Sequence, residues 1–161
     1  DEKALNNIFK GYGELRNAKK ITQNIINHRK NNEIKTTFDL IDVLKPIIPI
    51  KSKNKFLAQI FQAIRIEVNN ELEVLKSFLK QSSNLLKPGG RIVCISYHSL
   101  EDRYVKYFFQ NGNFHKNEEK DFFGNPLKVL FKVGKLIIPS TEEIKLNPRS
   151  RSAKLRIAEK K

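Results

Sequence analysis

The sequence has a single cysteine, three scattered histidines and no long run of apolar residues. One cysteine excludes a framework of internal disulfides, and the spacing of cysteine and histidine does not match a zinc site. Every apolar run is shorter than the roughly 20 residues that a membrane-spanning helix needs, and nothing resembles a signal peptide. These absences predict a reduced, cytoplasmic protein that has neither a metal site nor a membrane segment.

Acidic residues are also scarce. The chain has 17 Asp and Glu against 31 Lys and Arg, which gives a formal net charge of +14. Such an excess of positive charge predicts a polyanionic partner, either nucleic acid or an anionic membrane surface. The length of 161 residues suits one ordinary domain or parts of two. Because the first residue is Asp1 rather than Met, we expect the chain to be part of a longer protein.

The first half of the chain has the apolar spacing of helices. Apolar residues recur at helical intervals over 14–30, and Thr36 or Thr37 can cap a shorter helix that the following prolines end. A long apolar stripe over 57–79 predicts either one helix or two helices with a bend near 69–70.

The second half of the chain carries strand signals. After the breaker cluster LKPGG, the run RIVCIS at 91–96 is rich in β-branched residues, which predicts a central parallel strand buried on both faces. The segment 99–110 predicts a helix with Ser99 as its N-cap, and 127–134 and 153–160 predict two later strands. This order predicts an α/β chain that is preceded by a helical subdomain.

Two local patterns have simple structural explanations. The GYG at 11–13 resembles part of a dinucleotide-binding loop, but no strand precedes it and Arg16 stands where the third glycine belongs. We therefore predict a turn between two helices. Cys94 lies inside an apolar run, which predicts a core thiol rather than a nucleophile.

The segment 96–103, SYHSLEDR, is the first candidate functional site. It places polar and ionisable side chains where a strand gives way to a helix, and ligands of open α/β sheets bind outside the carboxyl ends of strands. The alternative is a plain strand-to-helix turn, in which Ser99 caps the helix, Glu101 and Asp102 favour its dipole, and His98 has no role. The pattern leaves both interpretations open.

The basic block near the C-terminus is the second candidate site. Ala153, Leu155 and Ile157 alternate with Lys154 and Arg156 along an extended strand, so these charges share one face. A solvated surface needs only lysine, whereas the three arginines of this block suit bidentate phosphate contact and stacking on bases. The block therefore predicts contact with nucleic acid.

Five longer blocks of the chain carry a resemblance to a known family. They are FQAIRIEVNNEL, LKPGGRIVCISYHSLEDRYVK, PSTEEIKLNPRSRSAKLRIAEK, YGELRNAKKITQNI and KTTFDLIDVLKPIIP. Together they resemble the bacterial 16S ribosomal RNA cytosine-N4 methyltransferase family. The resemblance implies a class I (Rossmann-like) methyltransferase domain that is interrupted by a helical substrate-recognition domain. Residues 1–62 would belong to the helical insert and 63–161 to the C-terminal part of the methyltransferase domain.

The same resemblance implies a reaction: methylation of the exocyclic N4 amine of a cytidine in the decoding region of 16S ribosomal RNA, with S-adenosylmethionine as the cofactor. The family's glycine-rich cofactor loop has no counterpart in this sequence, so we expect no cofactor-binding residues here and no activity from this chain alone. Ser96, His98 and Glu101 are the candidates for contact with the target base or its proton. The candidates for RNA contact are Arg103, Asn147, Arg149, Arg151, Lys154 and Arg156.

Two other functions stay open from the sequence. One is a non-catalytic RNA-binding module that acts in ribosome assembly. The other is a DNA amino-methyltransferase, which normally carries a Pro-Pro-aromatic motif that this sequence lacks. We also expect the strand 91–96 to leave an apolar edge exposed, which favours self-association.

Overall fold

The structure is a computed structural model that describes residues 1–116, 122–123 and 130–161. The chain divides into two compact units, Asp1–Glu71 and Leu72–Lys161. Each unit has its own cluster of buried apolar side chains, so each is described by itself.

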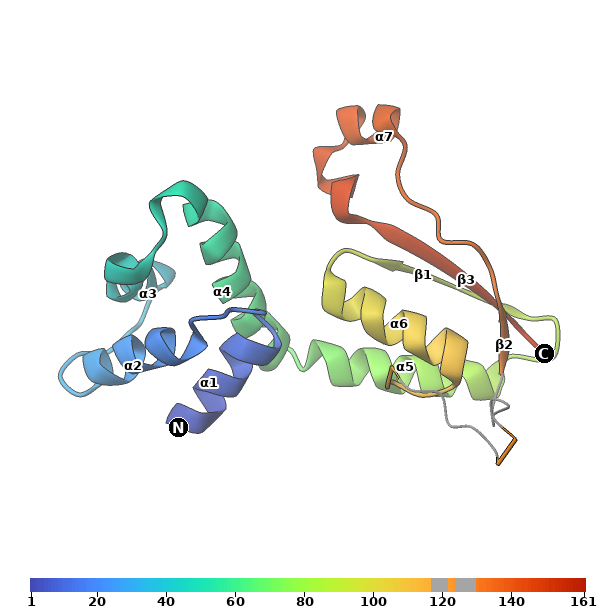
Figure 1. Ribbon diagram of the computed structural model, residues 1–161, viewed down its shortest axis with the longest axis horizontal. Coiled ribbons are helices and arrows are strands. Elements are labelled where there is room, and N and C mark those ends of the chain that lie inside the picture. Colours follow the sequence, from blue (N-terminus) through green and yellow to red (C-terminus); the bar gives the residue numbers. More distant parts are fainter. Residues whose placement is uncertain (117–121, 124–129) are drawn as a thin grey trace. The chain divides into compact units, whose positions relative to one another are not determined.

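The first unit is helical (Figure 1). It consists of α1 (Glu2–Gly11), α2 (Ala18–Arg29), α3 (Thr37–Leu44), two short 3-10 turns (Lys45–Ile47 and Ile50–Ser52) and α4 (Lys53–Val68). All four helices contribute to its core, which includes Phe9, Ile21, Leu44 and Ile60. The prediction of a helical first half is confirmed, although α1 was not predicted.

Local contacts fix the ends of these helices. The Thr36 hydroxyl accepts a hydrogen bond from the Asp39 N–H at 3.1 Å, and the Asp39 carboxylate accepts one from the Thr36 N–H at 2.8 Å. This reciprocal pair caps α3 as predicted. In the turn after α1, a Cβ on Gly13 would lie 2.7 Å from the Phe9 carbonyl oxygen. The position therefore requires glycine, and the prediction of a helix–helix turn is confirmed.

The long apolar stripe forms two helices, α4 and α5 (Glu71–Leu85). Asn70 between them has a φ of 52°, a left-handed conformation that asparagine tolerates better than most residues. The two-helix alternative is therefore correct. α4 runs without a break through 62–63, whereas the compact units divide after Glu71. The assignment of 1–62 and 63–161 to functional domains stays a prediction.

The second unit is α/β. It contains α5, β1 (Arg91–Ser96), α6 (Ser99–Asn111), β2 (Phe131–Val133), α7 (Thr141–Leu146), a 3-10 turn (Pro148–Ser152) and β3 (Lys154–Lys160). The strand order is β1-β3-β2, with both pairings antiparallel. Leu79 of α5 and Phe109 of α6 pack with Ile92, Phe131 and Ala158 of the strands, so both helices cover one face of the sheet.

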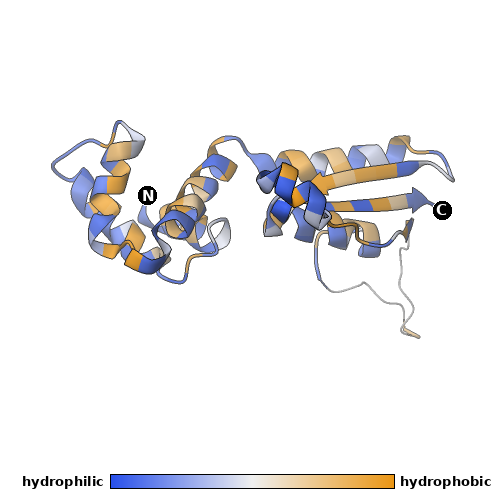
Figure 2. Ribbon diagram, turned by 90° about the horizontal axis from the view of Figure 1, so that it is seen from above, coloured by the Kyte–Doolittle hydropathy of each residue, from blue (hydrophilic) through white to orange (hydrophobic). Residues whose placement is uncertain are grey.

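β1 corrects the prediction of a central parallel strand buried on both faces. In the described part of the chain it lies at the sheet edge and pairs antiparallel with β3. Ile92 is 6% exposed, while Val93 and Ile95 are 54% and 55% exposed. Figure 2 shows β1 as a nearly continuous hydrophobic strand. A continuous apolar run indicates apolar side chains on both faces of a strand. It does not determine how many partner strands there are or in which direction they run.

The remaining predictions of secondary structure have mixed outcomes. β3 confirms the last predicted strand, and β2 confirms 131–133 of the strand predicted at 127–134, of which 127–129 lie outside the described residues. α7 and the 3-10 turn before β3 were not predicted. None of the helices that the structure describes is long and apolar enough to cross a membrane.

Candidate functional site at one end of the sheet

The two candidate segments from the sequence lie at the same end of the sheet. In the antiparallel register, Ser96 at the end of β1 is opposite Lys154 at the start of β3. The turn into α6 therefore leaves the sheet where the 3-10 turn Pro148–Ser152 enters it (Figure 1). Strand pairing brings together two polar segments that are far apart in the sequence.

The turn after β1 is closed by His98 and Glu101. His98 is the N-cap of α6, and its Nδ1 accepts a long hydrogen bond of 3.4 Å from the Glu101 N–H. The Glu101 carboxylate reaches back and accepts a hydrogen bond of 3.0 Å from the Tyr97 N–H. The predicted N-cap, Ser99, is instead the first residue of the helix. A histidine ring nitrogen performs the role that the sequence pattern assigned to a hydroxyl.

These contacts define the charge state of the turn. Because Nδ1 of His98 accepts a hydrogen bond, we assign the proton of the neutral ring to Nε2. Nε2 lies 3.2 Å from Glu101 Oε1, but the N–H does not point at this oxygen well enough for a hydrogen bond. Burial raises the pKa of Glu101, but His98 and the Tyr97 amide lower it by more, so the net pKa is below its usual value.

Asp102 binds two cations of β3 through three hydrogen bonds. Its side chain accepts hydrogen bonds from Arg156 Nε at 2.6 Å, Arg156 Nη2 at 3.2 Å and Lys154 Nζ at 3.0 Å. Asp102 is 7% exposed. Burial raises the pKa of this carboxyl, but the hydrogen bonds and positive charges of Arg156 and Lys154 outweigh it, so the pKa is lowered. The cluster ties the first turn of α6 to β3.

This cluster shows what the alternating charges of β3 face. Lys154 and Arg156 share a face of the strand with Ala158, which is fully buried. The charged positions of β3 therefore point towards α6, and the side chain of Arg156 is only 13% exposed. Contact of Lys154 and Arg156 with RNA stays a prediction, but both already have an intramolecular partner.

Arg149 and Arg151 are placed differently. They lie on the 3-10 turn, where the Asn147 side chain accepts a hydrogen bond from the Arg149 N–H at 3.2 Å and the Ser150 hydroxyl donates one to the Asn147 carbonyl at 2.8 Å. Ser150 is buried, while both arginines are exposed. Across the described ranges, neither guanidinium has a hydrogen-bonded or ionic partner. An anchored turn thus presents two available guanidinium groups.

The other candidate residues have simpler surroundings. Ser96 is 2% exposed at the end of β1, and Arg103 is exposed on α6. Cys94 packs against the core of the second unit. Burial raises the pKa of its thiol to about 11, which agrees with the predicted core thiol and disfavours a thiolate nucleophile at neutral pH.

The opposite face of the sheet carries a small apolar hollow at the same end. Its volume is about 110 Å³. The residues that line it are Ile95, Ile137, Ile138, Pro139, Glu143, Ala153 and Leu155. The site therefore combines exposed guanidinium groups, a capped strand-to-helix turn and an open apolar face.

Taken together, the fold and the site define an α/β protein with a helical unit and a cationic turn suited to phosphate groups. The chain belongs to the MraW methylase family, whose sequence profile matches residues 1–161. It is 57% identical to the ribosomal RNA small subunit methyltransferase H of Flavobacterium johnsoniae over 161 residues, or 99% of this chain and 53% of that protein. Proteins of the same name from Christiangramia forsetii and Bacteroides thetaiotaomicron are 54% and 49% identical over 160 and 163 residues.

The extent of these matches matters for function. The matches to the proteins of Christiangramia forsetii and Bacteroides thetaiotaomicron cover 99% and 100% of this chain, but only 53% of each of those proteins. The chain thus spans about half the length of the curated relatives it matches. The family resemblance that the sequence blocks indicated is confirmed.

Asp102 is the main residue of the site whose role was missed. For a plain strand-to-helix turn, the sequence predicted only that Asp102 favours the dipole of α6 from its first turn. A usable signal existed, because Asp102 precedes Val105 and Phe109 by three and seven residues and so shares their buried face of α6. A carboxylate on a buried helix face predicts a cationic partner, although the sequence does not identify that partner.

Proposed function

We propose that the protein acts in S-adenosylmethionine-dependent methylation of the N4 amine of a cytidine in the decoding region of 16S ribosomal RNA. The class I (Rossmann-like) sheet, the cytoplasmic location and the small ribosomal subunit as partner belong to this proposal. The observation that carries it is family membership over the whole chain, with relatives named as small-subunit ribosomal RNA methyltransferases. The net charge of +14 supports an RNA substrate.

RNA contact is proposed for the end of the sheet. Arg149 and Arg151 are the best placed of the predicted residues, because their guanidinium groups are exposed on an anchored turn. Such groups bind phosphate oxygens in bidentate fashion. Arg103, Asn147, Lys154 and Arg156 remain candidates, and Lys154, whose side chain is 41% exposed, is the more accessible of the two cations bound to Asp102.

Ser96, His98 and Glu101 are proposed to contact the target base or its proton. The lone pair of the cytosine amine is delocalised into the ring, so a catalyst has to orient the amine and accept its proton. With the proton on Nε2 and Nδ1 bonded to the Glu101 N–H, His98 has no free lone pair to accept one. Glu101 is therefore the better candidate acceptor, because its carboxylate is ionised at neutral pH and can take a proton, although its lowered pKa makes it a weak base.

S-adenosylmethionine would supply the methyl group from its sulfonium centre. The residues described here do not fit the cofactor cradle that the family resemblance implies. The strand-to-helix turn after β1 is Tyr97-His98-Ser99 and contains no glycine, and the Glu101 N–H at the start of α6 already bonds to His98. We therefore assign no cofactor-binding residue to the described part of this chain.

The decisive experiment is methyl transfer by a protein of the relatives' length. Small ribosomal subunits purified from a strain that lacks the enzyme would be incubated with protein and labelled S-adenosylmethionine, and the modified nucleotide would be mapped. N4-methylcytidine in the decoding region is the expected product. Transfer to another base, or to another position of cytosine, would refute the proposal.

A non-catalytic RNA-binding module is the second candidate function. It is favoured by one observation, the exposed cationic turn in a chain whose described residues form no cofactor cradle. The same assay separates the two functions, because tight binding of the small subunit without any methyl transfer would support the module.

A further inference from the structure

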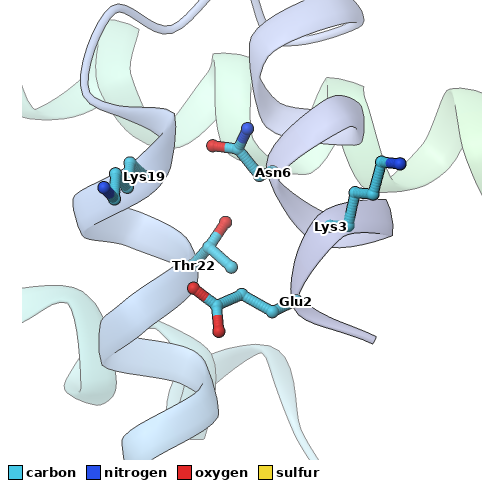
Figure 3. A pocket seen from close by; sticks show the side chains of 5 residues that line it. All are labelled: Glu2, Lys3, Asn6, Lys19 and Thr22. Atoms are coloured by element: carbon cyan, nitrogen blue, oxygen red, sulfur yellow. The ribbon is translucent and has the colours of Figure 1, made fainter.

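A polar hollow lies between α1 and α2 in the helical unit (Figure 3). Its volume is about 360 Å³, and it is lined by Glu2, Lys3 and Asn6 of α1 and by Lys19 and Thr22 of α2. Elsewhere these two helices contribute apolar side chains to the core. Glu2, Lys3 and Lys19 are exposed at the rim of the hollow, whereas Thr22 is buried.

Thr22 is the unusual member of this set. It is 1% exposed, and its hydroxyl oxygen has no hydrogen-bond partner in the described structure. A threonine inside a helix can satisfy its hydroxyl on a carbonyl of the preceding turn, and an unpartnered buried hydroxyl costs about 1–3 kcal/mol. Figure 3 shows Thr22 on the side of α2 that faces α1, between Asn6 and Glu2. A ligand in the hollow would supply the missing partner.

The charges around the hollow limit the chemistry of that ligand. Lys3 and Lys19 are exposed, and neither ammonium has a carboxylate partner in the ranges that the structure describes. They provide donors for an anion, but Glu2 adds a carboxylate that would repel a bare anion. The ligand must therefore accept hydrogen bonds at one end and donate them at the other.

We propose that this hollow binds one ribonucleotide unit of single-stranded RNA. The phosphate would lie at Lys3 and Lys19, and the donor groups of the sugar or base would reach Glu2, with Asn6 and Thr22 completing the contacts. The volume lies in the range of about 300–1,000 Å³ that is typical of small-molecule sites. The inference rests on the proposed function, because it assumes an RNA substrate, and it adds a specific subsite in the helical unit.

The first test compares two double variants of the 161-residue chain. Lys3→Ala with Lys19→Ala removes the two cations of the hollow, whereas Lys10→Ala with Lys20→Ala removes the same charge from the same helices outside it. Binding of a single-stranded fragment of small-subunit RNA would be followed by fluorescence anisotropy at one fixed salt concentration. The first pair is expected to lose at least about tenfold more affinity than the second, because it loses charge-assisted hydrogen bonds.

Substitution of Thr22 provides a second test, which leaves the net charge of the chain unchanged. Thr22→Val keeps the shape and removes the hydroxyl, so RNA affinity should fall about fivefold, while the melting temperature should stay the same or rise because a buried unpaired group is gone. Thr22→Ser should retain most of the affinity. If Thr22→Val binds RNA as tightly as the parent chain, the hydroxyl serves no ligand and the inference is overturned.

Two further arms identify the ligand. Cytidine monophosphate should shift the amide resonances around Thr22 and Asn6, whereas inorganic phosphate alone should shift them less. If an acidic peptide shifts the same resonances more than the nucleotide does, the hollow binds a protein partner rather than RNA, and the inference is overturned. Equal RNA losses in the two lysine pairs would refute the subsite alone, whereas a parent chain that does not bind RNA would refute both the subsite and the RNA contact proposed for this chain.

Discussion

Replacement of Asp102 by Asn is expected to destabilise the second unit strongly. The carboxylate accepts three hydrogen bonds from Arg156 and Lys154, and it is 7% exposed. An amide cannot neutralise two cations, and its NH₂ group would face their donors. Removal of one partner from a buried ion pair costs about 3–5 kcal/mol. Because Lys154 is partly exposed and can turn to water, we expect about 3 kcal/mol, the lower end of that range.

The effect should depend on pH in a defined direction. The pKa of Asp102 is lowered in the folded state, so its contribution to stability is complete above the unfolded pKa of about 3.9 and is lost as the pH falls through the lowered value. The difference in stability between the parent chain and Asp102→Asn should therefore be constant near neutral pH and shrink in strong acid.

Urea unfolding with hydrogen exchange of the α6 and β3 amides would measure this difference in the second unit. Asp42→Asn in the first unit is the control and is followed through the α3 amides, because Asp42 pairs with Lys45 at 2.8 Å on an exposed helix surface. Such pairs contribute about 0–1 kcal/mol. If Asp102→Asn costs no more than Asp42→Asn, the cluster does not hold α6 to β3 and the argument is wrong.

Four other predictions concern ligands and assembly. Calorimetric titration of the 161-residue chain with S-adenosylmethionine should show weak binding or none, and saturable low-micromolar binding would contradict this. RNA binding should weaken steeply with salt: the logarithm of the binding constant should fall with the logarithm of the salt concentration, by about 0.7 for each phosphate contacted. Binding that does not change with salt would show that the basic residues do not contact phosphates. In a protein of the relatives' length, Arg149→Ala with Arg151→Ala should weaken RNA binding about a hundredfold and leave cofactor affinity unchanged, while lysine at both positions should restore only part of the loss. One edge of β1 pairs with no described strand, and its apolar face is exposed, so the 161-residue chain should self-associate; a compact monomer over a wide concentration range in light scattering would count against this.

Local signals predicted most of the helical unit. The cap at Thr36, the turn at Gly11–Gly13 and the break at Asn69–Asn70 all depend on residues within a few positions of each other. Capping and left-handed conformations are properties of short segments, so the sequence is sufficient to find them. α1 was missed, although Asp is a common N-cap residue. In the structure the Asp1 side chain caps α1 by accepting a hydrogen bond from the Ala4 N–H.

The sheet could be predicted only in part. The positions of β1 and β3 follow from local composition, but their antiparallel pairing joins segments that are far apart in the sequence, 91–96 and 154–160. Strand direction and neighbours depend on the whole topology rather than on any one run of residues. The same limitation explains why Ser99 was wrongly predicted as the N-cap of α6. The use of His98 instead depends on the position at which the chain leaves β1 and enters the helix.

In the basic block near the C-terminus, the number of cations does not equal the number that are available to bind RNA. From the sequence, Arg149, Arg151 and Arg156 are equivalent candidates for bidentate phosphate contact, and Lys154 is a further candidate for RNA contact. The register of β3 directs Lys154 and Arg156 to Asp102, whereas Arg149 and Arg151 precede the strand on a turn that faces solvent. A cation that already shares a buried carboxylate gains less from a phosphate, because it must first give up that contact. The RNA-binding strength of this end of the sheet should therefore follow the two arginines of the turn more closely than the total charge of the block.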